Sequence, residues 1–317
     1  MAAFLFMRLV NTILCLLLGL LFIASGLLKL FPIEPFEYNF VRLGMANWLT
    51  APMISRSLIG LEVGLGLFLS LQFYLKRFTL RATLFLLIFF SIYLVYQLLT
   101  EGNSGNCGCF GTFLEMTPLE SLIKNMMMIG AVVWLIITKQ EPFLRLEENK
   151  IIKRVVLLGC ISASLILPYA LNIPEFISQN QFDKNQINYP LDLTQLYNSP
   201  DAPATDVRRG KHILSLMSLR CEHCKTAAFK MAIIFKRHPE MPFYNLYKGN
   251  AEKNLATFFA FTHAEAIPYS MYNTQDFITL SGGELPAIYW LEDGNVVRTS
   301  GYIDLEEQEI INWLNEP

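Results

Sequence analysis

The sequence predicts an α-helical membrane domain followed by a small α/β domain, because an apolar first part gives way to a polar second part. Of the 317 residues, 53% are hydrophobic and only 16% are charged, which is too apolar for a protein that is soluble along its whole length. Long stretches without charge fill the first 174 residues, whereas all four histidines lie in the last third. Short alternating segments separated by turn residues begin only after residue 210.

Each uncharged stretch supplies about 20 residues, enough for a helix to cross roughly 30 Å of hydrocarbon. The stretches show almost no polar face, as a lipid-exposed helix requires, and the second contains Glu62 as its single charge. A cleaved signal peptide ending near Ala24-Ser25-Gly26 is an alternative for the first stretch. We therefore predict five transmembrane helices, at residues 9–28, 57–75, 82–100, 125–138 (the centre of a run that begins near residue 119) and 155–174.

The loops between these helices differ in basic charge, and the more basic side of a membrane protein faces the cytoplasm. One side carries Arg8, Lys76, Arg77, Arg81, Lys139, Arg145, Lys150, Lys153 and Arg154, and the other carries Lys29, Arg42, Arg56 and Lys124. With the N-terminus inside, residues 101–118 and everything after residue 173 lie outside. We expect a multi-pass protein of the bacterial inner membrane, with Cys107, Cys109, Cys221 and Cys224 all on the periplasmic side.

The polar part begins with residues 175–209, whose three prolines predict an extracytoplasmic linker. An Asp293-Gly294 pair between two apolar segments is a strong hairpin signal, and Asp304 is a candidate N-cap for the last helix. We predict strands at 211–218, 242–247, 286–291 and 296–300, and helices at 221–237, 251–261 and 304–314. The predicted domains are residues 1–140 (a four-helix membrane domain), 150–174 (the fifth helix, a tether), 175–209 (the linker) and 210–317 (the α/β domain).

Cys221-Glu222-His223-Cys224 lies where a predicted strand ends and a helix begins. The amide groups at a helix N-terminus stabilise a thiolate, so Cys221 is the expected nucleophile and Cys224, one turn later, the resolving thiol. His223 adds positive charge that favours the thiolate, and Glu222 opposes it. A zinc site needs two further ligands, and His212, His238 and His263 stand at no recognisable spacing from this pair.

The order strand, Cys-x-x-Cys, helix, Leu285-Pro286, hairpin and closing helix resembles the thioredoxin superfamily over residues 211–317. The long interval from Cys221 to Pro286 is similar to that of extracytoplasmic thioredoxins of the TlpA and ResA type. The resemblance implies thiol–disulfide exchange and a cis Pro286 that faces the cysteine pair. One departure is Leu219-Arg220, because the family usually has a Trp before the first cysteine, and this leaves the redox potential and the partner open.

A second cysteine motif, Asn106-Cys107-Gly108-Cys109-Phe110-Gly111, lies in the loop between the third and fourth predicted helices. Gly108 allows the tight turn that a Cys-x-Cys disulfide needs, and such a small strained ring is a good oxidant. A structural disulfide or two unrelated thiols are the alternatives.

This motif, Gly26-Leu27-Leu28-Lys29 and the run 62–66 (EVGLG) resemble the MauE branch of the DoxX-like membrane proteins over residues 5–140. That resemblance implies a four-helix bundle and a role in the maturation of disulfide-containing extracytoplasmic proteins. The overall plan is also similar to the quinone-coupled enzymes of the VKOR and DsbB kind, without their motifs, which implies a quinone as electron acceptor.

Four more residues in or directly beside the predicted helices are candidates for function. Glu62 lies near the bilayer centre, where an ionisable group is costly; it is a candidate for proton handling or quinone contact, or else a neutral carboxyl that bonds Ser25, Thr12 or Asn11. We expect Lys29 to extend to the outer interface, with a pair to Glu62 as the alternative. Cys15 and Cys160 lie at similar depths, as in transmembrane redox pairs of the CcdA and DsbD kind, or are ordinary buried residues.

Together these features predict a membrane-bound thiol–disulfide oxidoreductase. Cys221 and Cys224 oxidise cysteines of extracytoplasmic proteins, Cys107 and Cys109 reoxidise them, and a membrane acceptor such as quinone takes the electrons; the reverse flow uses the same residues. We expect no covalently bound cofactor, and the net charge of −2 without a basic tract excludes nucleic-acid partners. A Cu or Zn chaperone with the four outer thiols as ligands, or an assembly scaffold, are the other two classes.

Overall fold

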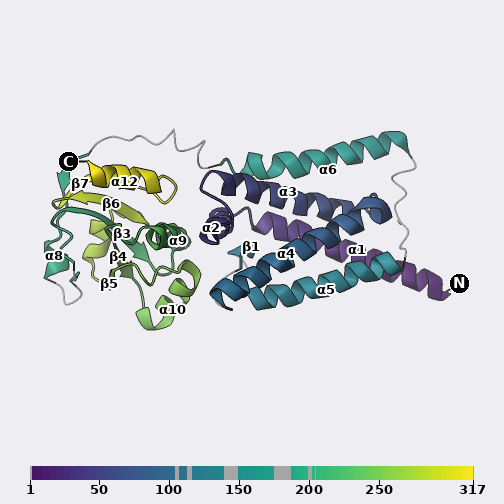
Figure 1. Ribbon diagram of the computed structural model, residues 1–317, viewed down its shortest axis with the longest axis horizontal. Helices are drawn as coiled ribbons and strands as arrows, with labels where there is room; N and C mark the ends of the chain where they lie inside the picture. The colour runs from purple at the N-terminus through teal and green to yellow at the C-terminus, as the bar shows by residue number, and fades with distance from the viewer. Residues whose placement is uncertain are drawn as a thin grey trace. The chain divides into compact units, whose positions relative to one another are not determined.

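The protein is described by a computed structural model that covers residues 2–103, 107–112, 116–138, 149–174, 187–198, 202–203 and 205–316. It forms two compact units, Met1–Pro174 and Glu175–Pro317 (Figure 1). Among the residues that the structure describes, the first unit contains helices and a short β1 segment (Cys109–Thr112), and the second contains a mixed sheet with helices around it.

Within the described residues, five helices are long and apolar enough to cross a membrane, so the prediction of a multi-pass membrane protein is confirmed. They are α1 (Ala2–Leu28), α3 (Thr50–Ser70), α4 (Leu80–Glu101, with the π-helical turn η1, Leu75–Thr79, before it), α5 (Pro118–Ile137) and α6 (Lys150–Leu171). Large apolar side chains on these helices point outward, for example Leu99 and Phe85. A lipid environment explains this exposure, which would be costly in water.

A short helix, α2 (Glu34–Arg42), was not predicted. Its ends carry ordinary helix signals, because Pro35 stands at the first turn, where its missing N–H costs nothing, and Arg42 stands in the last. Most of its side chains are buried, Glu37 among them, and Glu37 pairs with the buried Arg56 of α3. The helix is too short for hydrophobic periodicity to separate it from a loop.

The fifth spanning helix is more than a tether, because α6 packs directly against α3. A Cβ atom on Gly60 would lie 2.2 Å from the backbone oxygen of Ser164, so only glycine permits this approach. At its end, Asn172 donates to the Leu30 carbonyl at 2.7 Å and accepts from Arg56 Nε at 2.8 Å. These contacts make α6 part of the bundle.

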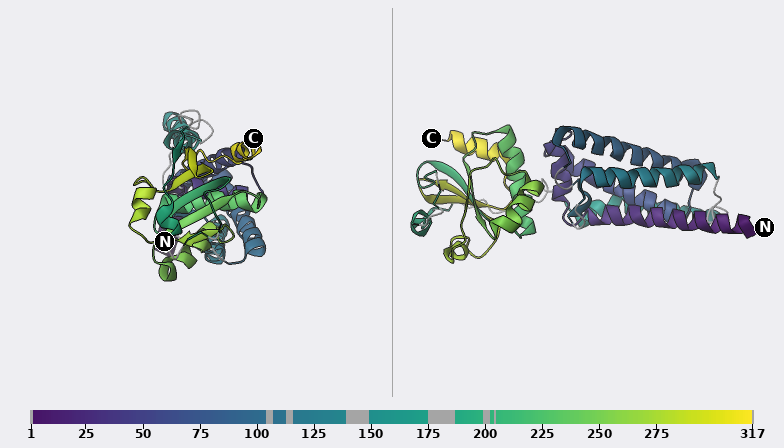
Figure 2. Two further views of the ribbon diagram at one scale, coloured as in Figure 1. Left: turned by 90° about the vertical axis from the view of Figure 1, so that its left-hand side faces the viewer. Right: turned by 90° about the horizontal axis from the view of Figure 1, so that it is seen from below.

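The second unit has one six-stranded sheet in the order β2-β7-β6-β3-β4-β5, whose strands lie side by side in one layer (Figure 2). The central strand β3 runs parallel to β4 and antiparallel to β6. This arrangement, with helices around it, is a thioredoxin-like fold. The elements are β2 (Tyr189–Pro190), α8 (Thr194–Tyr197), β3 (Lys211–Ser218), α9 (Glu222–Arg237), β4 (Phe243–Lys248), α10 (Ala251–Thr262), β5 (Tyr269–Met271), α11 (Asp276–Leu280), β6 (Ala287–Glu292), β7 (Asn295–Ser300) and α12 (Glu307–Asn315).

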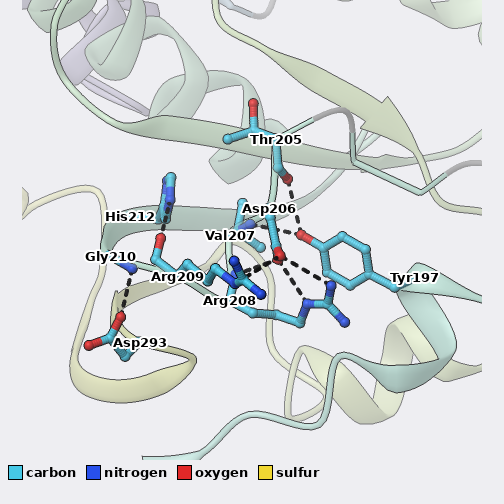
Figure 3. Close-up of polar contacts among 9 residues, drawn as sticks. All are labelled: Tyr197, Thr205, Asp206, Val207, Arg208, Arg209, Gly210, His212 and Asp293. Carbon is cyan, nitrogen blue, oxygen red and sulfur yellow. Dashed lines mark hydrogen bonds and ion pairs between the residues drawn. The ribbon is translucent and has the colours of Figure 1, made fainter.

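The prediction that residues 175–209 form a linker is wrong for the second half of this range. Leu193, Leu196 and Val207 are buried in the core of the sheet domain, and Figure 3 shows how the Tyr197 hydroxyl holds the segment together. That hydroxyl donates to the Thr205 carbonyl at 3.0 Å and accepts from the Val207 amide at 2.7 Å. These buried side chains were not predicted, because they are few and widely spaced in a segment rich in proline and polar residues. Residues 175–186 lie outside the described residues, as do Asn106, Lys139 and Arg145.

The turn that precedes the last helix also differs from the prediction. Asp304 does not cap α12, which begins after Glu306. Its carboxylate accepts instead from the Gly301 amide at 2.6 Å and closes the turn after β7. The Asp293-Gly294 hairpin is confirmed, since both residues adopt the positive φ that such a turn needs.

Candidate functional site

Cys221 is the N-cap residue of α9, directly after the central strand β3. Its sulfur accepts a hydrogen bond from the Cys224 amide at 3.3 Å and lies 4.0 Å from the Leu285 carbonyl oxygen. The side chain is partly exposed, so a substrate sulfur can reach it. A helix N-terminus offers amide donors and positive potential to a thiolate at this position.

Cys224, one turn later, is fully buried. Its sulfur accepts from the Ser218 amide at 3.4 Å. Burial, followed by the thiol of Cys221, raises the pKa of Cys224 well above that of an ordinary thiol. The two cysteines therefore differ as the sequence predicts, with an accessible sulfur first and a buried, protonated one second.

The Leu285–Pro286 peptide is cis, which confirms the expectation from the thioredoxin resemblance. The contact between Cys221 and the Leu285 carbonyl brings the start of β6 beside the cysteine pair. His223 lies near the surface, where its Nδ1 is 3.4 Å from the Tyr302 hydroxyl. Tyr302 was not predicted as a neighbour, since nothing in the sequence connects it to His223.

Glu222 forms an exposed ion pair with Lys225 at 2.9 Å. The expected opposition of Glu222 to the Cys221 thiolate is therefore partly offset by a neighbouring cation, although exposed pairs contribute little.

A buried polar chain runs through the strands beside Cys224. Ser215 donates to Asn245 Oδ1 at 2.6 Å, and Asn245 Nδ2 donates to the Tyr247 hydroxyl at 2.9 Å. All three side chains are fully buried. Burial raises the pKa of Tyr247, and the negative charge of a Cys224 thiolate would raise it further. Sequence analysis missed this chain, although polar residues inside otherwise apolar strands are its visible sign.

The Cys107–Cys109 segment makes a tight turn against the end of α1. Gly108 and Gly111 both have positive φ, of 74° and 63°, which glycine adopts without strain. A Cβ on Gly111 would lie 2.4 Å from the Leu28 carbonyl oxygen. The two glycines of the motif are therefore required by the backbone, as predicted for Gly108.

Both thiols of this segment are free in the structure. Cys107 is fully buried and its sulfur lies 2.9 Å from the Ser121 hydroxyl, while Cys109 is partly buried. The hydrogen bond from the Cys107 thiol lowers the pKa of Cys109 to about 6, and the charges of Lys124 and Lys29 act in the same direction. The same bond raises the pKa of Cys107 well above its usual range. Cys109 is thus the thiolate of the pair.

A cavity of about 40 Å³ opens beside these thiols, inside the helical unit. Its lining combines the two sulfurs, charged side chains and aromatic rings. The lining residues are Leu21, Phe22, Ser25, Lys29, Phe36, Glu62, Leu87, Phe90, Tyr93, Cys107, Cys109, Phe110, Lys124, Asn125 and Met128. A space of this size is large enough for a water molecule, but it is far smaller than the ~150 Å³ that accommodates a benzene ring.

Glu62 and Lys29 meet in this cavity. Lys29 Nζ lies 2.5 Å from Glu62 Oε1, and both side chains are buried. The expectation that Lys29 extends to the interface is therefore wrong, because a carboxylate within reach inside the bundle satisfies its charge. The alternative, a Lys29–Glu62 pair, is the arrangement found.

Of the three hydroxyl and amide partners considered for Glu62, Ser25 contacts it, at 3.3 Å. Thr12 instead donates to the Arg8 carbonyl, and Asn11 bonds Thr138 and Trp134. Ser25 also donates to the Cys109 carbonyl at 2.9 Å. The ion pair is thus linked to the cysteine segment through one hydroxyl.

The transmembrane redox pair of Cys15 and Cys160 remains a prediction. Cys15 packs among the leucines of the bundle core, and Cys160 is buried on α6; both helices pack on α3. Among the described residues, no group of three or more His, Cys, Asp and Glu side chains is placed to hold a metal ion.

Comparison with known proteins agrees with this division of the chain. Residues 7–138 match the family model of the methylamine utilisation protein MauE. Over 329 aligned positions the chain is 27% identical to Protein TlpB of Flavobacterium psychrophilum, covering 89% of this chain and 88% of that protein. The chain thus joins a membrane domain that matches the MauE family to a thioredoxin-like domain, and it is similar to TlpB over both.

Proposed function

We propose that this protein is a membrane-bound thiol–disulfide oxidoreductase that oxidises cysteines of extracytoplasmic proteins and passes their electrons into the membrane. The observation that supports this most is the presence of two differentiated dithiols in one chain. In each pair one sulfur is accessible or ionised and the other is buried and protonated. This difference is the requirement for directed disulfide exchange.

The first step takes place at the thioredoxin-like pair. A substrate thiolate attacks the Cys221 sulfur of the Cys221–Cys224 disulfide, forms a mixed disulfide and releases Cys224, which takes up a proton. The second substrate thiolate then attacks its own partner sulfur and releases Cys221. The substrate leaves with a disulfide, and the enzyme pair holds the two electrons.

In the second step the Cys107–Cys109 disulfide oxidises the Cys221–Cys224 dithiol by the same exchange. Cys221 attacks the more accessible Cys109 sulfur and releases the buried Cys107. Cys224 then attacks the Cys221 sulfur and releases Cys109 as a thiolate, which leaves readily because its pKa is low. The buried Cys107 takes up the proton. The electrons now reside beside the cavity of the membrane domain.

A quinone is the proposed acceptor of these electrons, and when bound it supplies a two-electron sink. The lining fits this chemistry in kind, because Phe22, Phe36 and Phe90 offer faces for a ring while Lys29 and Lys124 offer donors to its oxygens. Since the cavity of about 40 Å³ is too small for a ring, the aromatic lining has to open to admit it.

We place the protein in the bacterial inner membrane, with both dithiols on the periplasmic side. Loop charge supports this orientation. The partners are then periplasmic proteins with cysteines, together with membrane lipid.

The redox state of Cys221 and Cys224 in living cells tests the relay. Thiol trapping compares the wild type with the double variant Cys107→Ser/Cys109→Ser, and Cys15→Ser/Cys160→Ser serves as a control with intact outer motifs. Accumulation of the reduced Cys221–Cys224 pair in the first variant alone supports the proposal. Accumulation of the oxidised pair reverses the direction of flow, and no change in either variant rules out the relay.

A further inference from the structure

The proposed relay uses Lys29 as a hydrogen-bond donor to the acceptor, but it gives Glu62, the partner of Lys29 in a buried ion pair, no task. Both side chains are 3% exposed and lie inside a helical bundle. A buried ion pair adds little to stability compared with well-packed apolar residues, because both charges lose their hydration. A pair in this position is a functional candidate, and its neighbour is the Cys107–Cys109 segment.

The pair is one part of a group of interacting charges. Ser25 Oγ lies 3.1 Å from Lys29 Nζ, 3.3 Å from Glu62 Oε2 and 2.9 Å from the Cys109 carbonyl. Lys124 faces the same cavity and lies 4.3 Å from the centre of the Phe110 ring. The titratable groups that line this cavity are therefore Lys29, Lys124, Glu62, Cys107 and Cys109, with the Tyr93 hydroxyl at its edge.

The sum of their charges changes when the dithiol is oxidised. With Cys109 as the thiolate of the reduced pair, the formal charges of Cys109 and Glu62 balance those of Lys29 and Lys124. Formation of the disulfide removes the thiolate charge and leaves one uncompensated cation. In a medium of low dielectric constant an uncompensated charge is costly, and loss of one proton restores neutrality.

We propose that Lys29 is the acid that loses this proton, with Glu62 as the group that receives it first. One dithiol then gives one disulfide, two electrons and two protons: Cys107 loses the first proton and Lys29 the second, while Cys109 enters the reaction as a thiolate. Re-reduction of the disulfide restores the Cys109 thiolate, and Lys29 regains its proton from water. The pair thus holds the proton that a two-electron, two-proton acceptor such as a quinone requires.

The geometry favours Lys29 over Lys124 for this role. Glu62 Oε1 lies 2.5 Å from Lys29 Nζ and is placed to accept its proton directly. Lys124 contacts the Phe110 ring, which cannot accept a proton. The cavity is large enough for a water molecule that carries the proton onward.

This proposal rests on the oxidation of Cys107 and Cys109 described above, but it depends neither on Cys221 nor on the identity of the acceptor. The test therefore uses ferricyanide, which takes electrons and no protons. The full chain carries Cys221→Ser/Cys224→Ser and Cys15→Ala/Cys160→Ala, so that one dithiol remains. Protons released per disulfide are counted with an indicator dye at pH 7.5, above the pKa of Cys109.

The parent protein is expected to release about two protons per disulfide, by the charge balance above. Lys29→Arg keeps the positive charge and cannot give up the proton, so it is expected to release about one. The double variant Lys29→Met/Glu62→Gln replaces the pair with neutral side chains, and it is also expected to release about one. Lys153→Arg, at a lysine of α6 that contacts the Tyr74 ring outside this cavity, is the matched control and is expected to keep the parent value.

Release of about one proton by the parent, or of about two by both Lys29 variants, overturns the proposal. Far-UV circular dichroism and the count of ferricyanide reduced confirm that each variant is folded and oxidises its dithiol. A failed relay in cells would leave this result intact, because the pair Cys221–Cys224 is absent from the assay. Conversely, a working relay together with an unchanged proton count would rule out the role of Lys29 and leave the proposed function intact.

Discussion

At the scale of single residues, the two sulfurs of each cysteine pair lie in different environments. Cys221 is accessible at the start of α9, and Cys224 lies fully buried behind it. In the membrane unit the difference is electrostatic. The Cys107 thiol donates a hydrogen bond to Cys109, and the positive charges of Lys124 and Lys29 stabilise the Cys109 thiolate. The exchange proposed for each pair uses this division.

Trapping of substrates distinguishes Cys221 from Cys224. Cys224→Ser removes the resolving thiol, so mixed disulfides between Cys221 and substrate proteins accumulate in the membrane fraction. Cys221→Ser leaves a buried sulfur with a raised pKa, and no such adducts form. Non-reducing electrophoresis measures both, and adducts on the Cys221→Ser variant alone would reverse the assignment.

Cys109 is expected to react at a lower pH than an ordinary thiol. Its pKa of about 6 means that the thiolate prevails at neutral pH and is lost by protonation as the pH falls through 6. In a variant without the other cysteines except Cys107, the alkylation rate is expected to have its midpoint near pH 6. Lys124→Met removes one stabilising charge and moves the midpoint upward; a midpoint near 9 in the parent contradicts the assignment.

At the scale of elements, close helix packing depends on a few glycines. Gly60 and Gly64 of α3 lie against Ser164 of α6, and Gly66 lies against Gly19 of α1. Small residues at such contacts let helix backbones approach within a membrane, where no hydrophobic effect drives them together. The bundle is therefore expected to be sensitive to larger side chains at these positions.

Gly60→Val tests the contact between α3 and α6. The added side chain would meet the Ser164 backbone oxygen at 2.2 Å from its Cβ, and overpacking of this kind costs about 1–3 kcal/mol. A lower thermal midpoint in detergent is expected. Gly159→Ala, on α6 with open space around its Cβ, is the control and is expected to be neutral; equal loss in both variants would contradict the packing argument.

Much at this scale could be predicted from the sequence, and the failures have physical causes. Uniform apolar runs identify spanning helices, and the Asp293-Gly294 turn fixes a hairpin, because both effects are local. The position of Lys29 was missed because a buried cation depends on a carboxylate 33 residues away. The Ser215–Asn245 bond was missed for the same reason, because it joins residues 30 positions apart. The segment before β3 was missed because its few apolar side chains are widely spaced among prolines and polar residues.

At the scale of the whole molecule, the chain combines two units that each have a core of their own. Each contains one dithiol. In the proposed relay, exchange between the two pairs is a reaction between two folded bodies in one polypeptide, for which a transient encounter of one sulfur with another is sufficient.

Direct exchange predicts a disulfide between the units. The variant Cys107→Ser/Cys224→Ser keeps Cys109 and Cys221, the leaving and the accessible sulfur, and is expected to form an intramolecular disulfide. A mobility shift under non-reducing conditions that disappears with reductant detects it. The further change Cys109→Ser is the control, and a shift that persists in it, or no shift in the parent, argues against direct exchange.

The buried ion pair also has a consequence for the biogenesis of the protein. A charged residue at the centre of a spanning helix costs roughly 2.5–3.5 kcal/mol on insertion scales, and Glu62 carries this cost when α3 leaves the translocon alone. Lys29, directly after α1, is synthesised 33 residues before Glu62 and is already present when Glu62 leaves the translocon. Insertion of α1 and α3 as a pair lowers this cost, because Lys29 then offsets the charge of Glu62 inside the bundle.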